Sequence, residues 1–184
     1  MGQIVAQNPG ALVADQGTQQ YLTFTLGHET FAIGILHIKE IIEYGNLTEI
    51  PMMPAFIRGV INLRGSVVPV IDLAARFGGK ATEIGRRTCI VIVEITQLID
   101  EVEVRQDIGV IVDSVNEVID IPRADIEPPP AFGARIRADF ITGMGKVAGN
   151  FVIILSINNV LSVDEMATLS GSAHVEPAEA GIAA

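Results

Sequence analysis

Short runs in which apolar and polar residues alternate cover most of this chain, and this period of two constrains the fold more than any other feature. In the first run Leu22, Phe24 and Leu26 lie on one face of an extended strand, and Thr23 and Thr25 lie on the other. Segments rich in Gly, Pro and Asn separate the runs, as in small all-β domains. The pattern predicts a mainly β fold with one or two small β-barrels.

Strands and helices can be placed from this pattern. Asp72–Phe77 before two glycines predicts a short helix, and the S-x-x-E capping box at Ser162–Glu165 predicts a helix over 163–169. The acid-rich stretch 96–107 is expected to be a hairpin tip. The expected strands are 21–26, 31–35, 38–43, 58–63, 67–71, 88–95, 108–113, 115–121, 140–146 and 151–156.

Charge and composition narrow the class of partner. The net charge is −10, and the two tails hold only three of the 22 acidic residues and none of the 12 basic ones. The acidity therefore belongs to the folded part, which argues against nucleic-acid binding and against anionic membranes. No apolar run reaches the roughly 18 residues of a membrane span, and no secretory signal is recognisable. We expect a cytosolic protein without direct membrane insertion.

A search for catalytic or metal-binding residues finds no cluster. The three histidines, His28, His37 and His174, lie far apart and lack the spacing of metal ligands. Cys89, the single cysteine, opens an apolar run and is expected to be an inert small hydrophobe. We therefore expect no catalytic residue, no metal and no cofactor, which favours a binding module.

One residue in a predicted turn has no role in folding that the sequence explains. Gly65 suits a reversal because glycine accepts positive φ, whereas nothing about a turn requires Arg64 before it. Pro69 lacks an N–H and indicates a sheet edge or a neighbouring β-bulge. Arg64 can be a solvated turn residue, one half of an exposed ion pair, or a contact residue in a protein interface.

The order of several motifs resembles the CheW family of bacterial chemotaxis coupling proteins. The resemblance extends from about residue 20 to 169, and its most specific part is Asn-Leu-Arg-Gly followed by Pro-Val-Ile-Asp-Leu. The acidic insert around 97–107 departs from the family pattern. The matching segments, in order, are Tyr21–Gly27, Phe31–Ile33, Ile38–Ile41, Pro54–Gly65, Val68–Leu73, Gly109–Asp113 and Ile141–Gly145.

The resemblance implies a fold and a function. Members consist of two SH3-like five-stranded β-barrels packed together, with few short helices including a C-terminal one. Here this domain would span 19–170 and divide near residue 88, between a flexible arm (1–18) and a disordered tail (171–184). Members are adaptors, not enzymes, that link the cytoplasmic tips of methyl-accepting chemoreceptors to the regulatory domain of the histidine kinase CheA. The chain would be cytoplasmic, associated with membrane receptor arrays through these partners, and a monomer when isolated.

The resemblance also assigns contact residues by position. Phe132 is similar to an aromatic residue of a kinase contact, although it could instead close a barrel as a core residue. Glu40, two residues from Ile38, is expected on the same strand face, and an ion pair between Glu40 and Arg64 would order the partner-facing loop. The apolar positions could be ordinary core residues. The residues assigned to the receptor-binding surface are Ile38, Glu40, Asn62, Arg64, Val115 and Val118.

Two other functions stay open at this point. A small barrel can host an enzyme or a ligand-binding site, because fold and function are separable. Alternatively, the chain serves a chemosensory pathway whose output is not flagellar movement.

Overall fold

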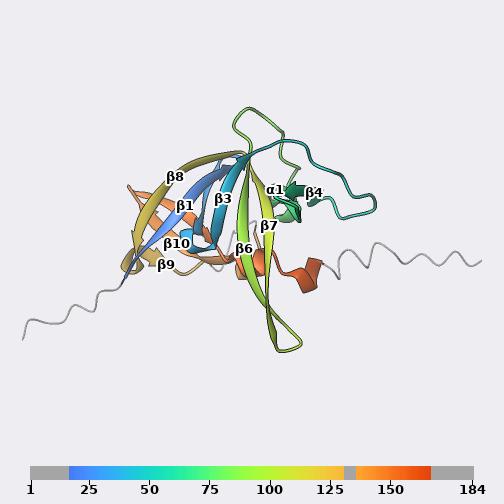
Figure 1. Cartoon of the computed structure of the whole chain (residues 1–184). Coiled ribbons are helices and arrows are strands. Elements are labelled where there is room, and N and C mark those ends of the chain that lie inside the picture. The colour runs from blue at the N-terminus through green and yellow to red at the C-terminus, as the bar shows by residue number, and fades with distance from the viewer. Residues whose placement is uncertain (1–16, 131–135, 167–184) are drawn as a thin grey trace, which may run out of the picture.

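Two β-sheets pack face to face in the computed structural model, which describes residues 17–130 and 136–166 (Figure 1). The first sheet has the strand order β8-β1-β2-β11-β10-β9, and the second has the order β3-β6-β7-β5-β4. The strands of the first sheet are β1 (Thr18–Leu26), β2 (Glu29–Gly34), β8 (Ser114–Pro122), β9 (Ile126–Glu127), β10 (Ile141–Val147) and β11 (Asn150–Leu155). Those of the second are β3 (Ile38–Glu43), β4 (Ile57–Leu63), β5 (Ser66–Asp72), β6 (Cys89–Ile99) and β7 (Val102–Val112).

Helical elements are short. The α-helices are α1 (Leu73–Arg76) and α2 (Ile157–Val160), and the 3-10 turns are η1 (Ile35–His37), η2 (Arg123–Asp125) and η3 (Ala138–Phe140). Residues 163–166 are also helical, and the Ser162 hydroxyl accepts the Glu165 N–H at 3.4 Å, as the capping box predicts. The rest of that predicted helix lies outside the described residues.

The mainly β fold with two packed units and few short helices is confirmed. Every predicted strand is present, and the two-residue β9 adds a sixth strand to the first sheet by pairing with Met144 and Gly145. The sheets, however, do not divide the chain at one point. Residue 88 lies between strands of the second sheet, since residues 114–155 return to complete the sheet that begins with β1 and β2.

A large apolar core lies between the two sheets. Phe24 and Phe31 contribute from the first sheet, and Val91 and Val93 contribute from β6 of the second. The intervening β6 residues, Ile90 and Ile92, face a smaller cluster enclosed by the second sheet itself. Residues 90–93 of β6 are therefore buried on both faces, which explains the uninterrupted apolar run in this part of the strand. Each such buried side chain contributes roughly 1.5–3 kcal/mol.

Pro69 lies inside the second sheet and not at its outer edge. It pairs with Val60 of β4, and pairing of β5 with β7 begins only at Val70, so the missing N–H of the proline is not needed there. A β-bulge in β4 at Ile57–Gly59 lies close by. Of the two alternatives that Pro69 indicated, the structure shows the neighbouring bulge and not the sheet edge.

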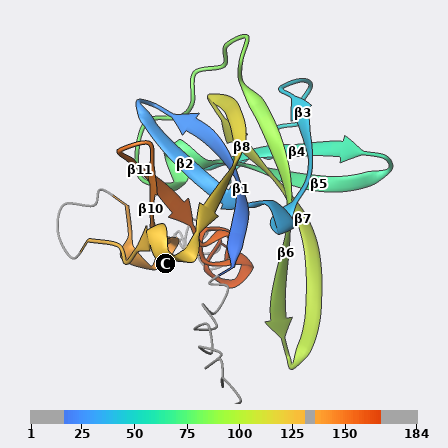
Figure 2. The same cartoon turned by 90° about the vertical axis from the view of Figure 1, so that its left-hand side faces the viewer.

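The acid-rich insert forms the end of a long two-stranded ribbon. β6 and β7 stay paired out to Ile99 and Val102, and the two-residue turn between them consists of Asp100 and Glu101. Two perpendicular views show this ribbon projecting away from the rest of the molecule (Figures 1 and 2). The predicted hairpin tip is thus correct, and its strands are longer than predicted.

Candidate functional site

Arg64 and Glu40 form a two-point ion pair on the surface of the second sheet. Arg64 Nη1 donates to Glu40 Oε1 at 2.9 Å, and Nη2 donates to Oε2 at 2.7 Å. Arg64 comes from the β4–β5 turn and Glu40 from β3, and β3 and β4 are the two edges of this sheet. The pair therefore joins the edges of a curled sheet. The ion pair predicted from the sequence is confirmed.

The backbone at Arg64 is unusual. Arg64 has φ 52° and Gly65 has φ 86°, so both central residues of the turn are left-handed. Such turns favour Asn or Gly at the first position, because a side chain there costs roughly 1–2 kcal/mol. Asn62 supports the turn, since its Oδ1 accepts the Gly65 N–H at 2.9 Å. The turn presents the Arg64 guanidinium at a cost in backbone energy.

Further charged residues extend this surface. Lys39 lies 2.8 Å from Asp107 and 3.1 Å from Glu94, and it borders a shallow hollow that Glu40 and Arg64 also line. Hydrogen bonds to Asp107 and then Glu94 raise the pKa of Lys39, and the hydrogen bond to Glu40 raises the pKa of Arg64. Both cations stay charged across the physiological range, so the surface offers fixed, alternating charges to a partner.

Ile38 and Glu40 do not share a strand face. Ile38 pairs with Val93, whereas Glu40 pairs with Ile92, and the register shifts between them at a β-bulge. Ile38 consequently packs against the core between the sheets, while Glu40 faces the hollow. The expectation of one shared face is wrong, because the bulge adds a residue and reverses the alternation.

The other assigned residues are divided between two sheets. Asn62 and Arg64 lie beside Glu40 on the second sheet, whereas Val115 and Val118 lie on β8 of the first. Val115 packs against the core, and Val118 is exposed. Phe132 lies outside the described residues. The structure thus brings Glu40 and Arg64 together, with Asn62 bonded to the turn that holds Arg64, and leaves Val115 and Val118 on a different sheet.

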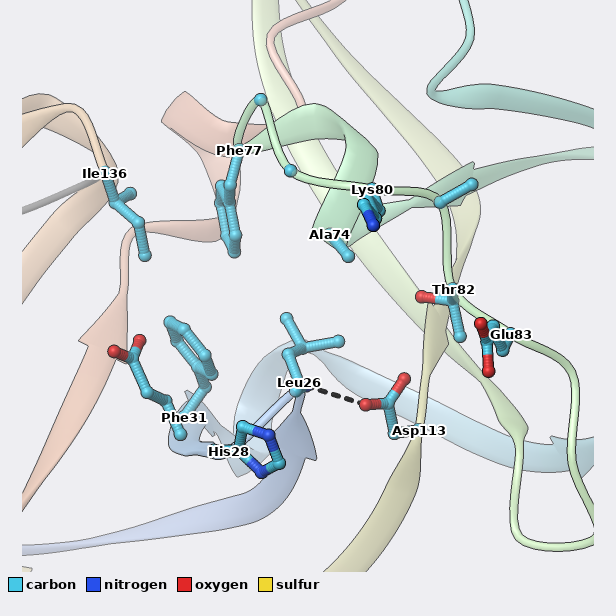
Figure 3. A pocket seen from close by; sticks show the side chains of 15 residues that line it. Leu26, His28, Phe31, Ala74, Phe77, Lys80, Thr82, Glu83, Asp113 and Ile136 are labelled. Atoms are coloured by element: carbon cyan, nitrogen blue, oxygen red, sulfur yellow. Dashed lines mark hydrogen bonds between the residues drawn. The ribbon is translucent and has the colours of Figure 1, made fainter.

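A groove of about 980 Å³ lies between the β1–β2 turn and the segment that runs from α1 to Glu83 (Figure 3). Phe31 and Phe77 form part of its wall, with ring centroids 5.7 Å apart. On the opposite side Asp113 Oδ2 accepts the Gly27 N–H at 2.7 Å, close to the β1–β2 turn. Thr82, which also lines the groove, donates its hydroxyl to the buried Asp72 carboxylate at 3.0 Å.

A buried arginine joins the helical segments near the C-terminal end of the described chain. Arg76 Nε donates to the Val160 carbonyl at 3.0 Å, and Arg76 Nη2 lies 3.2 Å from Glu165 Oε1. Arg137 pairs with the same Glu165 carboxylate and with Asp139. Burial would raise the pKa of Glu165, but hydrogen bonds from Arg137 and Arg76 outweigh it and hold the pKa below its usual value.

Sequence reasoning missed two of these arrangements. Arg76 and Glu165 are 89 positions apart; each lies in a predicted helix, but neither helix indicates which residue the other would contact. Lys39 alternates with Ile38 and Glu40 like any strand residue, so its ion pairs with β6 and β7 follow only from the sheet order. The available signal was the alternation of charged and apolar residues in β3, which places a charged face on that strand.

The described residues contain neither a cluster of possible metal ligands nor a helix that could cross a membrane. No group of three or more His, Cys, Asp or Glu side chains there could hold a metal ion. Among residues 17–130 and 136–166, no helix has the length and hydrophobicity that crossing a membrane requires.

Comparison with known proteins identifies relatives along most of the chain. Residues 20–165 match the family model described as a CheW-like domain. The chemotaxis protein CheW of Klebsiella aerogenes is 34% identical over 155 residues, which cover 84% of this chain and 89% of that protein. The protein FrzA of Myxococcus xanthus is 32% identical over 140 residues, covering 76% of this chain and 82% of that protein.

A solved structure agrees with the fold. The scaffolding protein TtCheW from Thermoanaerobacter tengcongensis superposes with a TM-score of 0.70 at 35% sequence identity. The superposition covers 80% of this chain and 95% of that one. The similarity therefore extends over both sheets and not over one of them alone.

Proposed function

This chain belongs to the CheW family, and from that premise we propose that it couples methyl-accepting chemoreceptors to the histidine kinase CheA as a non-catalytic adaptor. Its relatives include chemotaxis proteins and a scaffolding protein, which supports an adaptor in chemotaxis signalling. In this proposal it acts in the cytoplasm and reaches the receptor arrays at the membrane through its two partners.

The exposed Arg64–Glu40 pair is the observation that carries the proposal. An ion pair exposed to water contributes only about 0–1 kcal/mol to folding, yet Arg64 holds it from a left-handed backbone position that opposes folding. A role in folding explains this arrangement poorly. A planar guanidinium fixed at two points presents its remaining N–H donors in a defined direction, which suits recognition of a partner.

Receptor and kinase would use different parts of the molecule. We assign the receptor to the surface around Glu40, Asn62 and Arg64, together with the more apolar positions Ile38, Val115 and Val118. A helical receptor tip with an apolar stripe bordered by polar groups fits such a mixture. We assign Phe132 to a kinase contact, and Phe132→Ala should weaken kinase binding with little loss of stability.

Reconstitution with a receptor cytoplasmic fragment and CheA tests the proposal. Wild-type protein should confer receptor control on kinase autophosphorylation. Arg64→Ala should lose roughly tenfold or more in coupling, since truncating an interface arginine costs about 2 kcal/mol, while remaining folded. Lys146→Ala is the matched control, because it removes an exposed ion pair of 2.6 Å with Glu127 on the first sheet.

Two outcomes would contradict different parts of this proposal. If wild-type protein binds neither receptor fragment nor kinase, the adaptor function is wrong. If folded Arg64→Ala couples normally, the adaptor function stands and Arg64 is only a turn residue.

A further inference from the structure

The outer part of the β6–β7 ribbon has a free strand edge. From Val102 to Gln106, β7 pairs with β6 on one side only. Its other neighbour, β5, pairs with β7 only from Gly109 to Ile111. Within the described chain no other element lies along this edge (Figures 1 and 2). Exposed edges are templates for pairing with another strand.

The side chains on this edge are two exposed valines and two residues of opposite charge. Val102 is 62% exposed and Val104 is also exposed, so one face of the ribbon tip is apolar. Glu103 lies between these two valines in the sequence and Arg105 follows Val104, so both charged side chains point to the opposite face. Proteins usually block such an edge with charged side chains (lysine above all), proline or a bulge. Val102–Gln106 contains no lysine, proline or bulge, and its two charged residues, Glu103 and Arg105, have opposite signs and can pair across the edge.

The backbone groups of Glu103 and Arg105 are directed toward the free edge. Ile99 and Val102 flank a two-residue turn, and residues in this position form a hydrogen-bonded pair. Hydrogen-bonded and non-hydrogen-bonded pairs alternate along an antiparallel ladder. Val102 and Val104 therefore direct their backbone groups to β6, and Glu103 and Arg105 direct theirs outward.

We infer that this edge pairs with the same edge of a second copy of the chain, antiparallel, about a two-fold axis at Val104. In that register Glu103 lies opposite Arg105 of the second copy, and Arg105 lies opposite its Glu103. The two Val104 side chains meet at the axis as a non-hydrogen-bonded pair. A continuous four-stranded sheet results, with β7 of each copy at its centre.

Charge complementarity selects the second copy as the occupant and also fixes the register. The sequence Val-Glu-Val-Arg-Gln complements itself when it is reversed, which is what a two-fold axis requires. A register centred on Glu103 or on Arg105 would place two like charges directly opposite each other, which is destabilising. Within each chain Arg105 already lies 3.2 Å from Glu103, so pairing exchanges two internal contacts, one in each copy, for two contacts between copies.

The contact is small, and it is independent of the proposed adaptor function. Five residues per chain bury far less than a stable dimer interface requires. An isolated monomer at low concentration is compatible with it, and pairing becomes significant where many copies are held close together. The ribbon would then join neighbouring copies side by side.

Disulfide trapping tests the pairing in the full-length protein. Val104→Cys, in a background with Cys89→Ala, places two thiols at a non-hydrogen-bonded pair with Cα atoms about 4.5 Å apart, within the range that a disulfide accepts. Mild copper-phenanthroline oxidation should convert it to a covalent dimer. Leu98→Cys in the same background is the control, because Leu98 lies on the same ribbon and is 72% exposed.

Charge reversal tests the register. Glu103→Arg or Arg105→Glu, each added to Val104→Cys, should slow dimer trapping roughly tenfold by opposing like charges. The double reversal should restore it, since both cross pairs become attractive again. Equal trapping of Leu98→Cys and Val104→Cys, or failure of the double reversal to restore trapping, would overturn the inference. Thermal melts of each variant verify that the fold is intact.

Discussion

Arg64 and Arg76 are twelve positions apart, and each pairs with a glutamate, yet their surroundings differ completely. The Arg64 side chain is 76% exposed and joins two edges of one sheet. The Arg76 side chain is 5% exposed and connects α1 with Val160 and Glu165 near the C-terminal end of the described chain. The guanidinium group thus lies on the surface at Arg64, whereas at Arg76 it connects buried segments of the chain.

The difference shows that environment decides what an ion pair contributes. Water screens the exposed pair, so its net value to folding is about 0–1 kcal/mol. A buried pair is costly to desolvate, but removing one partner leaves the other charge buried and unpaired, which costs roughly 3–5 kcal/mol. Arg76 also stacks over the rings of Phe56 and Phe140, at 5.1 and 4.8 Å from their centroids. We therefore assign Arg76 to folding and Arg64 to recognition.

Arg76→Ala should show the largest effect on stability. It removes the hydrogen bond to Val160, both cation–π contacts and one partner of Glu165. We expect the free energy of unfolding to fall by about 3 kcal/mol, as for other broken buried pairs. Urea denaturation measures it, with Arg64→Ala as the exposed control. Equal losses in both variants would remove the distinction between the two arginines.

Glu165→Gln should have an intermediate and pH-dependent effect. The folded-state pKa of Glu165 lies below its unfolded value, so ionised Glu165 stabilises the fold above the unfolded pKa. This contribution disappears as the pH falls through the folded pKa. Wild type should therefore be more stable than the variant at pH 7, and the difference should shrink below about pH 4.5.

Urea midpoints measured at several pH values check this expectation. Arg137 contacts both Glu165 and Asp139, and its hydrogen bond lowers the pKa of Asp139 as well. A residual acid sensitivity in Glu165→Gln is therefore expected from Asp139. An unchanged difference between wild type and variant from pH 7 to pH 3 would show that the Glu165 carboxylate adds nothing through its charge.

Periodicity predicts the strands but not their irregularities. Alternation located β1 through Leu22, Phe24 and Leu26, and the turn at Gly65 was also recognisable. The bulge between Ile38 and Glu40 was not recognisable from the sequence, because one inserted residue does not visibly change the alternation in a six-residue strand. The helix α2 was not recognisable either, because its four residues are too few to display a helical period.

Contacts between residues that are far apart in the sequence could not be predicted from local patterns. β8 returns to pair with β1, so Thr23 Oγ1 donates to the carbonyl of Glu117, 94 positions away. No local pattern specifies such a contact. The Arg64–Glu40 pair was predictable because the motif resemblance placed both residues on one surface, whereas no pattern placed Arg76 and Glu165 near each other.

Arg64→Ala should have a small effect on stability. Alanine keeps the left-handed backbone and loses only the exposed pair with Glu40, so the loss should not exceed about 1 kcal/mol. Urea denaturation on the preparation used for receptor coupling gives the comparison directly. A loss near that of Arg76→Ala would mean that the pair holds the curled sheet closed and is part of the fold.

Arg64→Gly should change stability least of all, and it separates the backbone from the side chain. Glycine adopts φ near 52° without the penalty of about 1 kcal/mol that alanine or arginine meets there. This gain offsets the lost ion pair. The free energy of unfolding of Arg64→Gly should therefore be close to that of wild type and about 1 kcal/mol higher than that of Arg64→Ala. Receptor coupling should nevertheless fail in both variants, because both lack the guanidinium. Coupling retained by Arg64→Gly and lost by Arg64→Ala would show that the shape of the turn, and not the arginine, is what the partner recognises.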